Sequence, residues 1–462
     1  MSASIVYKND TLVSFDSGSK TLKTAGKYLE DDIAVTVDGS GGGGGEPAPK
    51  KQINFIDYDG TILYSYTKSE WQNESALPEN PSHTGLTAQG WNWTKAQIDA
   101  QLTALPDGDV WVGQMYITDD GKTRIYIHLE KGRLTPYLAI APSGEVEVDW
   151  GDNSATGIIT GSSYTTEQYA YHEYANEGDY TITLSVTYGG FAFYGHSYLS
   201  YILKKDATSI TSEADARRHQ VYASAVRKVE VGSNVRIGLN AFSYCYSLES
   251  VTIPSGVAID DRAFRYCYSL SSITIPSGIA VINGSLFDNC YSLSSVAIPS
   301  GVTSISDSAF RSCQSLASIT IPSSVTSMGY YVFLYCYSLS SVAIPSGVTS
   351  ISQDTFRYCQ SLASVTIPSS VISIGAYAFQ HCYSLASVTI PSGVTSMGSY
   401  VFYDCLGMAE YHLLPTTPPT LSDQYAFNNI QSDCKIYVPS ASLETYKTAS
   451  NWSNYASYMV GE

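Results

Sequence analysis

A repeat of 22 or 23 residues runs through the second half of the chain. Each repeat is marked by a phenylalanine that a cysteine follows three residues later. A fixed period of this size means that one small structural unit is stacked many times, which predicts a solenoid rather than a globule with one enclosed cleft. The phenylalanines are Phe242, Phe264, Phe287, Phe310, Phe333, Phe356, Phe379 and Phe402.

Each repeat is expected to contain one short strand. In the repeat that begins at Phe356, the spacing of two between Val365 and Ile367 places both side chains inward, and Pro368 ends the strand. Phe356 and Cys359 are three residues apart, which suits one face of a helical turn on the opposite wall. We therefore expect a core column that includes Phe264, Cys267, Phe287, Cys290, Phe310 and Cys313.

All nine cysteines lie in the C-terminal half, eight of them at the repeat position. Neighbouring coils lie about 4.8 Å apart, so disulfides between successive repeats are possible on distance alone. An odd number of cysteines without a pairing pattern favours free thiols that pack as small apolar groups. A zinc site is disfavoured because no CxxC or HxxxH motif accompanies them.

The repeats resemble the BspA-like, or Treponema-type, leucine-rich repeats. The LxxVxIP motif of that family occurs at Leu293, Val296, Ile298 and Pro299, and again from Leu385 to Pro391. The resemblance implies a leucine-rich-repeat solenoid over residues 206–434 and a closing cap over residues 435–462. A degenerate first coil is expected around Val229, Val231, Val235 and Ile237.

The first half of the chain divides at a glycine-rich linker, residues 39–51. Residues 1–38 form a small β module, too short to be robust alone, which we interpret as an attachment piece. Residues 52–130 hold four of the six tryptophans and are expected to form an α+β domain. A helix is predicted from Thr94 to Leu105, and a hairpin is predicted around Asp120 and Gly121.

Residues 131–205 resemble a PKD-type, immunoglobulin-like β-sandwich. This resemblance implies a spacer domain with Trp150 in its core and a tight turn beside it. The matching residues are Trp150, Gly151, Asp152, His172, Tyr174, Gly178, Tyr180, Thr181, Thr183 and Leu184. The whole chain is thus predicted to be a multidomain, mainly β protein.

The net charge of −17 argues against a nucleic-acid partner, since such proteins gather Lys and Arg on one face. The sequence has no run of about 18 or more apolar residues, so no membrane insertion is expected. From Phe242 to Cys405 there are four Arg, no Lys and seven acidic residues. The solenoid surface should therefore be largely uncharged.

The outward strand positions of the repeats are mostly Ser and Thr, and a Tyr or Gln follows each cysteine. Tyr combined with Ser is typical of adaptable recognition surfaces, which suits a glycan or protein ligand. The alternative is that these residues only keep an uncharged sheet soluble and were copied by repeat duplication. The candidate ligand-binding residues are Tyr246, Tyr268, Tyr291, Gln314, Tyr337, Gln360 and Tyr383.

Residues 55–63, FIDYDGTIL, are similar to the nucleophile motif of haloacid-dehalogenase-type phosphatases. The resemblance implies that Asp57 attacks phosphorus and that Asp59 acts as acid and base. That fold needs a parallel sheet with crossover helices, which the following sequence does not predict, so the favoured interpretation is a strand that ends in an Asp-Gly turn. We expect neither an enzyme nor a cofactor.

Two acidic pairs could bind Ca²⁺, although pairs on turns are usually only turn residues, so no metal site is predicted. They are Asp107 with Asp109 and Asp119 with Asp120.

Residues 1–38 and the segment that begins at Phe55 are similar to modules at the front of virion structural proteins of phages. This resemblance implies a receptor-binding virion protein, tail or capsid fibre type, which residues 1–38 join to other virion proteins. It would meet a glycan or protein of the host surface and could form a trimer. The main alternative is a BspA-like adhesin on a bacterial surface, and the phosphatase is a distant third.

Overall fold

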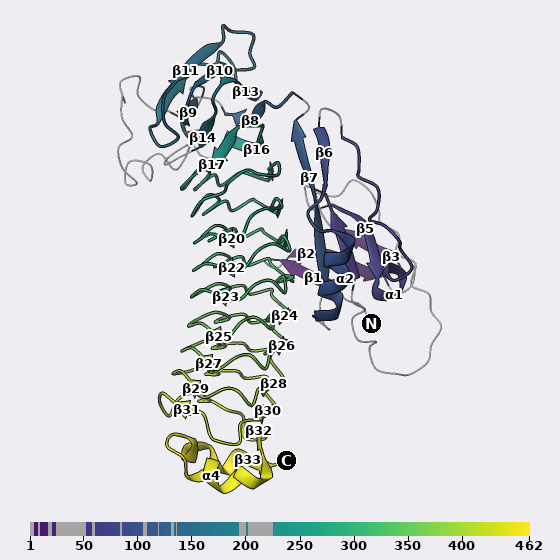
Figure 1. Ribbon diagram of the computed structural model, residues 1–462, viewed down its shortest axis with the longest axis vertical. Coiled ribbons are helices and arrows are strands. Elements are labelled where there is room, and N and C mark those ends of the chain that lie inside the picture. Colours follow the sequence, from purple (N-terminus) through teal and green to yellow (C-terminus); the bar gives the residue numbers. More distant parts are fainter. Residues whose placement is uncertain are drawn as a thin grey trace. The chain divides into compact units, whose positions relative to one another are not determined.

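The computed structural model describes residues 4–7, 10–16, 21–24, 52–57, 61–83, 86–104, 109–118, 120–130, 134, 136–193, 200–201 and 225–462. It divides into two units, residues 1–50 and residues 51–462. The expectation of a mainly β protein with a C-terminal solenoid is confirmed (Figure 1). The linker at 39–51 and the predicted boundary at 205–206 lie outside the described residues.

The first unit contains one antiparallel sheet of three strands. They are β1 (Ser4–Tyr7), β2 (Asp10–Asp16) and β3 (Thr21–Thr24), in that order.

The second unit begins with a four-stranded mixed sheet, ordered β5-β4-β7-β6. Its buried side holds Trp71, Trp91 and Trp93 around Phe55, whose ring lies 4.9 Å from that of Trp91. The strands are β4 (Gln52–Ile56), β5 (Ile62–Thr67), β6 (Leu86–Trp91) and β7 (Val110–Thr118), with helices α1 (Lys68–Trp71) and α2 (Lys95–Ala104). We call residues 52–118 the docking layer, because strand β7 of this segment packs against the first strands of the solenoid.

Helix α2 matches the helix predicted from Thr94 to Leu105. Thr94 and Gln97 cap its start reciprocally: the Gln97 N–H donates to Thr94 Oγ1 at 3.3 Å, and the Thr94 N–H donates to Gln97 Oε1 at 2.8 Å. The predicted hairpin around Asp120 and Gly121 is wrong. Strand β7 pairs with β4 and β6, whereas β8 (Thr123–Leu129) pairs with β13 (Gly178–Tyr188) and β16 (Val226–Glu230) in the next sheet.

Two facing sheets follow, ordered β11-β10-β13-β8-β16-β18 and β12-β9-β14-β17, with β15 paired to β9. Their inner faces share one hydrophobic core, as in a β-sandwich. The strands before the repeats are β9 (Pro136–Pro142), β10 (Glu145–Asp149), β11 (Gly157–Thr160), β12 (Gln168–Tyr171), β13 (Gly178–Tyr188), β14 (Phe191–Phe193), β15 (Ser200–Tyr201), β16 (Val226–Glu230) and β17 (Val235–Ile237).

Trp150 lies in the sandwich core and is 5% exposed. The Tyr174 hydroxyl donates to the Trp150 carbonyl at 2.6 Å, and the His172 ring stacks on the indole at 5.2 Å. Gly151 adopts a left-handed φ of +77°, and a Cβ there would lie 2.4 Å from the Thr181 carbonyl oxygen. The tight turn beside Trp150 therefore requires glycine.

The sandwich continues directly into the solenoid. Strand β16, in the predicted degenerate first coil, pairs with β8 of the sandwich on one side and with β18 of the first repeat on the other. Strand β17 likewise pairs with β14 and forms a bridge to Ile259. The two sheets of the sandwich thus become the two strand rows of the solenoid, and one core runs through both.

Each coil contributes up to two short parallel strands, one to each row. The first row contains β18 (Ser250–Thr252), β19 (Ser272–Thr274), β21 (Ser295–Ala297), β24 (Ser341–Ala343), β26 (Ser364–Thr366), β28 (Ser387–Ile390), β30 (Glu410–Leu413), β32 (Lys435–Val438) and β33 (Met459–Gly461). The second contains β20 (Val281–Ile282), β22 (Ser304–Ile305), β23 (Ser327–Met328), β25 (Ser350–Ile351), β27 (Ser373–Ile374), β29 (Ser396–Met397) and β31 (Thr420–Leu421).

The repeat phenylalanines stack in a column inside the coils, with neighbouring ring centres 5.2 to 5.8 Å apart from Phe242 to Phe427. Phe193 of the sandwich meets the column at Phe242, at 4.8 Å, and Trp452 closes it beyond Phe427, at 5.4 Å. The cysteines are free and buried beside the column.

The C-terminal residues cover the last coil with η2 (Ser440–Ser442), α4 (Leu443–Thr448), η3 (Trp452–Tyr458) and β33. Three buried aromatic side chains each donate a hydrogen bond to a carbonyl of the last coil. Tyr446 bonds Pro415 at 2.8 Å, Trp452 bonds Pro419 at 2.7 Å and Tyr455 bonds Gln424 at 2.5 Å. Over the described ranges, no helix has the length and apolar character needed to cross a membrane.

Candidate ligand-binding surfaces

The predicted Tyr and Gln positions lie in the turn after each buried cysteine, and most are half-buried. Only three of the seven form a continuous stack: Tyr246, Tyr268 and Tyr291, with successive ring centres 4.6 Å apart. Burial and the neighbouring rings raise the pKa of Tyr268 to about 12. Gln314 and Gln360 interrupt the row of rings, while Tyr337 contacts Tyr335 at 6.0 Å and Tyr383 is 37% exposed.

A second row of rings lies two residues before the first and was not predicted. Tyr244 stacks on Tyr266 at 4.6 Å, and Tyr358 stacks on Tyr335 at 5.0 Å and on His381 at 4.3 Å. All five residues have a left-handed φ between 61° and 65°, which is uncommon for aromatic residues. The only available sequence signal was the repetition of Tyr at this position in several repeats.

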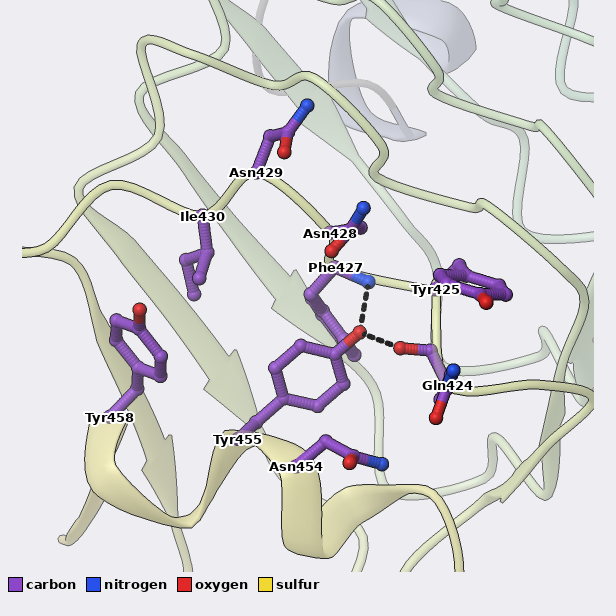
Figure 2. A pocket seen from close by; sticks show the side chains of 9 residues that line it. All are labelled: Gln424, Tyr425, Phe427, Asn428, Asn429, Ile430, Asn454, Tyr455 and Tyr458. Atoms are coloured by element: carbon purple, nitrogen blue, oxygen red, sulfur yellow. Dashed lines mark hydrogen bonds between the residues drawn. The ribbon is translucent and has the colours of Figure 1, made fainter.

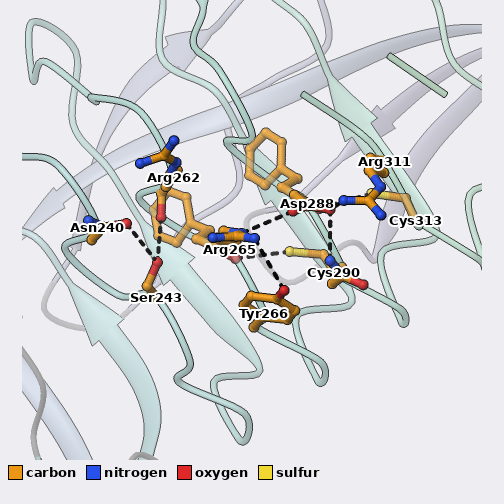
Figure 3. A network of polar contacts seen from close by, with 12 residues as sticks. Asn240, Ser243, Arg262, Arg265, Tyr266, Asp288, Cys290, Arg311 and Cys313 are labelled. Carbon is orange, nitrogen blue, oxygen red and sulfur yellow. Dashed lines mark hydrogen bonds and ion pairs between the residues drawn. The ribbon is translucent and has the colours of Figure 1, made fainter. Parts of the chain in front are cut away.

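A buried carboxylate neutralises much of the positive charge near these rings. Asp288 is 1% exposed, and its Oδ2 accepts from Arg265 Nε at 3.0 Å, while Arg311 Nη1 lies 4.0 Å from its Oδ1 (Figure 3). Burial raises the pKa of Asp288, and the two arginines only partly oppose this. Arg265 also lies over the Tyr266 ring at 4.6 Å. Arg265 and Arg311 are therefore both paired with the buried Asp288 carboxylate.

The outward Ser and Thr side chains of the first strand row form what we call the strand face. Over the first coils this face is covered: Thr252, Ser272, Thr274, Ser295 and Thr320 are all buried. The cover is the docking layer, whose strand β7 lies against β18, β19 and β21. The outward Ser and Thr positions of these coils are thus not accessible to a ligand.

The docking layer holds the strand face through side-chain donors to backbone carbonyls. Trp93 Nε1 donates to the Ile298 carbonyl at 2.8 Å, and Gln101 Nε2 donates to that of Ile321 at 3.0 Å. Asn92 Nδ2 is 3.4 Å from the carbonyls of both Ile275 and Ala297.

Ile275, Ile298 and Ile321 each precede a proline, at a spacing of 23 residues. Proline has no N–H and cannot continue a β-ladder, so the carbonyl before it is available to a side-chain donor. The docking layer therefore recognises a feature that the repeat sequence creates once per coil.

The remaining strand face is open. Ser364, Thr366, Ser387 and Thr389 are exposed, and Ile344 and Ile367 repeat the Ile-Pro sequence there. Further along, the face becomes charged: both ring nitrogens of His412 lie near carboxylates, 3.1 Å from Glu462 and 3.3 Å from Glu410. The open part is thus an uncharged Ser and Thr surface that is bounded by the docking layer and by this His412 cluster.

The 55–63 segment includes the end of β4 and the start of β5, which pair antiparallel with Ile56 opposite Ile62. Asp57 directly follows β4 and is buried, and its Oδ2 lies 2.7 Å from His83 Nε2, while Asp59 is outside the described residues. Two neighbouring antiparallel strands differ from the strand and crossover helix of the phosphatase motif.

Asp120 is paired with Arg124, and the Asp109 carboxylate accepts from the Gln52 N–H. Asp107 and Asp119 lie outside the described residues. Among the described residues there is no group of three or more His, Cys, Asp or Glu that could hold a metal ion.

Several solved structures are similar to parts of the chain. A leucine-rich repeat protein of T. pallidum is 28% identical, covering 38% of this chain and 75% of that one with a TM-score of 0.28. A leucine-rich cell surface protein of Faecalibacterium prausnitzii is 26% identical, covering 51% and 73%, with a TM-score of 0.28. The pneumococcal vaccine antigen PcpA is 16% identical, covering 52% and 76%, with a TM-score of 0.24.

No curated protein matches the chain. Residues 235–363 and 349–452 match the BspA type leucine-rich repeat region, in six copies. These residues contain the stacked coils, the proline-terminated strands and the aromatic column. The stacked coils of this solenoid therefore match BspA type leucine-rich repeats.

Proposed function

We propose that this chain is a non-enzymatic, adhesin-like protein of a bacterial surface. It presents the open strand face to a ligand. The observation that carries the proposal is the docking layer itself. It shows which contacts this face can make: side-chain donors from outside bond the carbonyls before the prolines. The same surface continues, uncovered, over β26 and β28.

The chemistry of the open part suits a polar partner. Ser and Thr hydroxyls can donate and accept hydrogen bonds, and the uncharged surface imposes no strong charge preference. BspA-type repeats typically occur in bacterial cell-surface proteins, which supports that location over a virion. The virion interpretation keeps only the sequence resemblance of the N-terminal segments.

The ligand face is tested with matched pairs of substitutions. Ser364→Glu with Ser387→Glu places two charges on the open strand face, and Ser327→Glu with Ser350→Glu places two at the exposed positions of the second row. Adherence of the purified full chain to intact bacterial cells and to immobilised mucin is then measured. We expect at least a tenfold loss for the first pair and no change for the second, whereas equal adherence would remove this face as the site.

The location is tested on producing bacteria. Brief protease treatment of intact cells should release solenoid peptides that mass spectrometry identifies. Their absence from cells, together with recovery of the chain from purified phage particles, would overturn the cell-surface proposal and restore the virion interpretation.

A further inference from the structure

A cavity of about 410 Å³ lies at the C-terminal end of the solenoid, between the last coil and η3 (Figure 2). This volume is within the range of about 300–1,000 Å³ that is typical of small-molecule sites. The cavity is lined by residues between 424 and 458, beyond the open coils at β26 and β28 that carry the proposed ligand face. Gln424, Asn429 and Asn454 at its edge are exposed, so it is open to solvent.

The cavity has a fixed wall. The Tyr455 side chain is 5% exposed and packs against the Phe427 ring at 5.3 Å. Its hydroxyl accepts from the Phe427 N–H at 3.2 Å and donates to the Gln424 carbonyl at 2.5 Å. Both sides of the cavity, the last coil and the cap, are therefore tied together through one buried side chain.

Aromatic rings flank the opening. Tyr425 is the last ring of a stack with Tyr400 and Tyr377, at 5.2 and 5.3 Å, and is 38% exposed. Tyr458 lies on the opposite side, on η3. The face of such a ring carries partial negative charge and attracts the polarised C–H groups on one face of a pyranose.

The polar lining consists of carboxamides, which can donate and accept at once. The side chains of Gln424 and Asn428 have no hydrogen-bond partner among the described residues. Asn429 Nδ2 donates to Asp404 at 2.5 Å and Asn454 Nδ2 donates to the Asn451 carbonyl at 3.0 Å, which leaves their amide oxygens as acceptors. Neighbouring hydroxyls of a sugar ring need this mixture of donors and acceptors.

No charged side chain is among the described residues that line the cavity. A phosphate or carboxylate ligand would lose its hydration without gaining a cation, and a metal ion would find no carboxylate ligand. In contrast, a neutral hydroxylated ring satisfies the carboxamides and covers the tyrosines.

We propose that this cavity binds a neutral sugar residue, as a second site that is separate from the strand face. Tyr425 supplies the stacking surface, and Asn428 and Gln424 supply the hydrogen bonds that orient the ring.

The test uses the full chain and saturation-transfer NMR with glucose, galactose, mannose and N-acetylglucosamine, and with sialic acid as the anionic comparison. We expect transfer to at least one neutral sugar and none to sialic acid. Tyr425→Ala and, separately, Asn428→Ala should each weaken that binding at least tenfold. Tyr330→Ala, which removes a 52% exposed tyrosine outside the cavity, is the matched control and should bind as the unaltered chain does.

Transfer to no neutral sugar, transfer to sialic acid alone, or unchanged binding by Asn428→Ala would each overturn the proposal. Asn428→Ala removes only an amide that has no partner among the described residues, so it should not disturb the fold. Its effect on sugar binding therefore tests the proposal even if Tyr425→Ala disturbs the cap. Ser364→Glu with Ser387→Glu should leave sugar binding unchanged, which distinguishes failure of this site from failure of the strand face.

Discussion

Cys267 and its counterparts in the following coils have the same surroundings. From Cys267 to Cys405, each thiol donates to the carbonyl of a phenylalanine in the preceding coil, with Sγ and O 3.1 to 3.3 Å apart. Burial raises the pKa of Cys405, and also that of Cys245, to about 12. Because the thiolate is the reactive form, these cysteines should be chemically inert in the folded chain.

We predict that maleimide at pH 7.5 labels none of the eight repeat cysteines in the native protein and labels all of them in denaturant. Mass spectrometry of peptides after timed labelling measures this directly. Fast native labelling of one repeat cysteine would show that its coil is open.

Asp152 lies in the tight turn that follows β10, next to Trp150 and Gly151. Burial alone would raise the pKa of its carboxyl, but hydrogen bonds from Ser154 and His172 outweigh burial and lower the pKa to about 2. A carboxyl whose pKa is lower in the folded chain stabilises it fully above its unfolded value of about 3.8. That contribution disappears as the pH falls towards 2.

Asp152→Asn should therefore lower the free energy of unfolding of the sandwich by about 1–2 kcal/mol at pH 7. The difference from the unaltered chain should shrink between pH 4 and pH 2 and stay constant between pH 5 and pH 7. Thermal unfolding followed by tryptophan fluorescence checks both. Asp179→Asn is the control, because its 2.7 Å contact with His128 is exposed and should matter little. A difference that persists undiminished at pH 2 would contradict this account.

At the scale of single residues, the sequence predicts a residue's position where that position depends on the chemistry of the residue and its immediate neighbours. Trp150 and Gly151 could be placed because a large apolar ring beside a Gly-Asp pair predicts a buried side chain next to a tight turn. The left-handed φ of Tyr244 and Tyr266 could not be foreseen, since it depends on how one coil seats on the next and not on a residue preference.

At the scale of elements, the coil is the unit of stability. Phe310 contacts Phe287 and Phe333 at 5.5 and 5.7 Å, so it links three consecutive coils. In a solenoid each unit is stabilised mainly by its neighbours, and loss of one contact pair propagates along the stack.

Phe310→Ala should lower the free energy of unfolding by about 3–5 kcal/mol, because it leaves a cavity in the column. Hydrogen exchange should rise first in the coils around residues 287–333. Ile372→Ala, which truncates a 52% exposed side chain, should change stability little. If exchange rose uniformly over the whole solenoid, coil-by-coil stabilisation would be wrong.

The first strand row could be predicted because the period of Phe356, Val365 and Pro368 recurs in the sequence. The prediction of one strand per repeat missed the second row, β20 to β31, whose strands are only two residues long. The hairpin prediction failed because β7 and β8, although adjacent in sequence, join different sheets. The Asp-Gly turn signal describes a chain reversal, but the pairing of β8 with β13 depends on which apolar faces meet in three dimensions.

At the scale of the second unit, one strand face has two parts: the docking layer covers the first coils, and the last coils are open. The contact between Asn92 and Ile275 joins residues 183 positions apart, so no local pattern could reveal it. The cover is also imperfect, since the hydroxyls of Ser272 and Thr274 are buried without a partner among the described residues. Burying a hydroxyl in this way costs about 1–3 kcal/mol, which offsets part of the docking energy.

The central claim is that the two parts of this face differ only in cover, and matched cysteines test it most directly. Thr274 and Thr366 occupy the same outward position in two coils, one covered and one open. Since all nine native cysteines, Cys434 included, are buried and should not react, maleimide reports only the introduced cysteine. We expect rapid labelling of Thr366→Cys and at least tenfold slower labelling of Thr274→Cys, which Gln101→Ala should accelerate by removing two docking bonds. Equal labelling rates at the two positions would contradict the account.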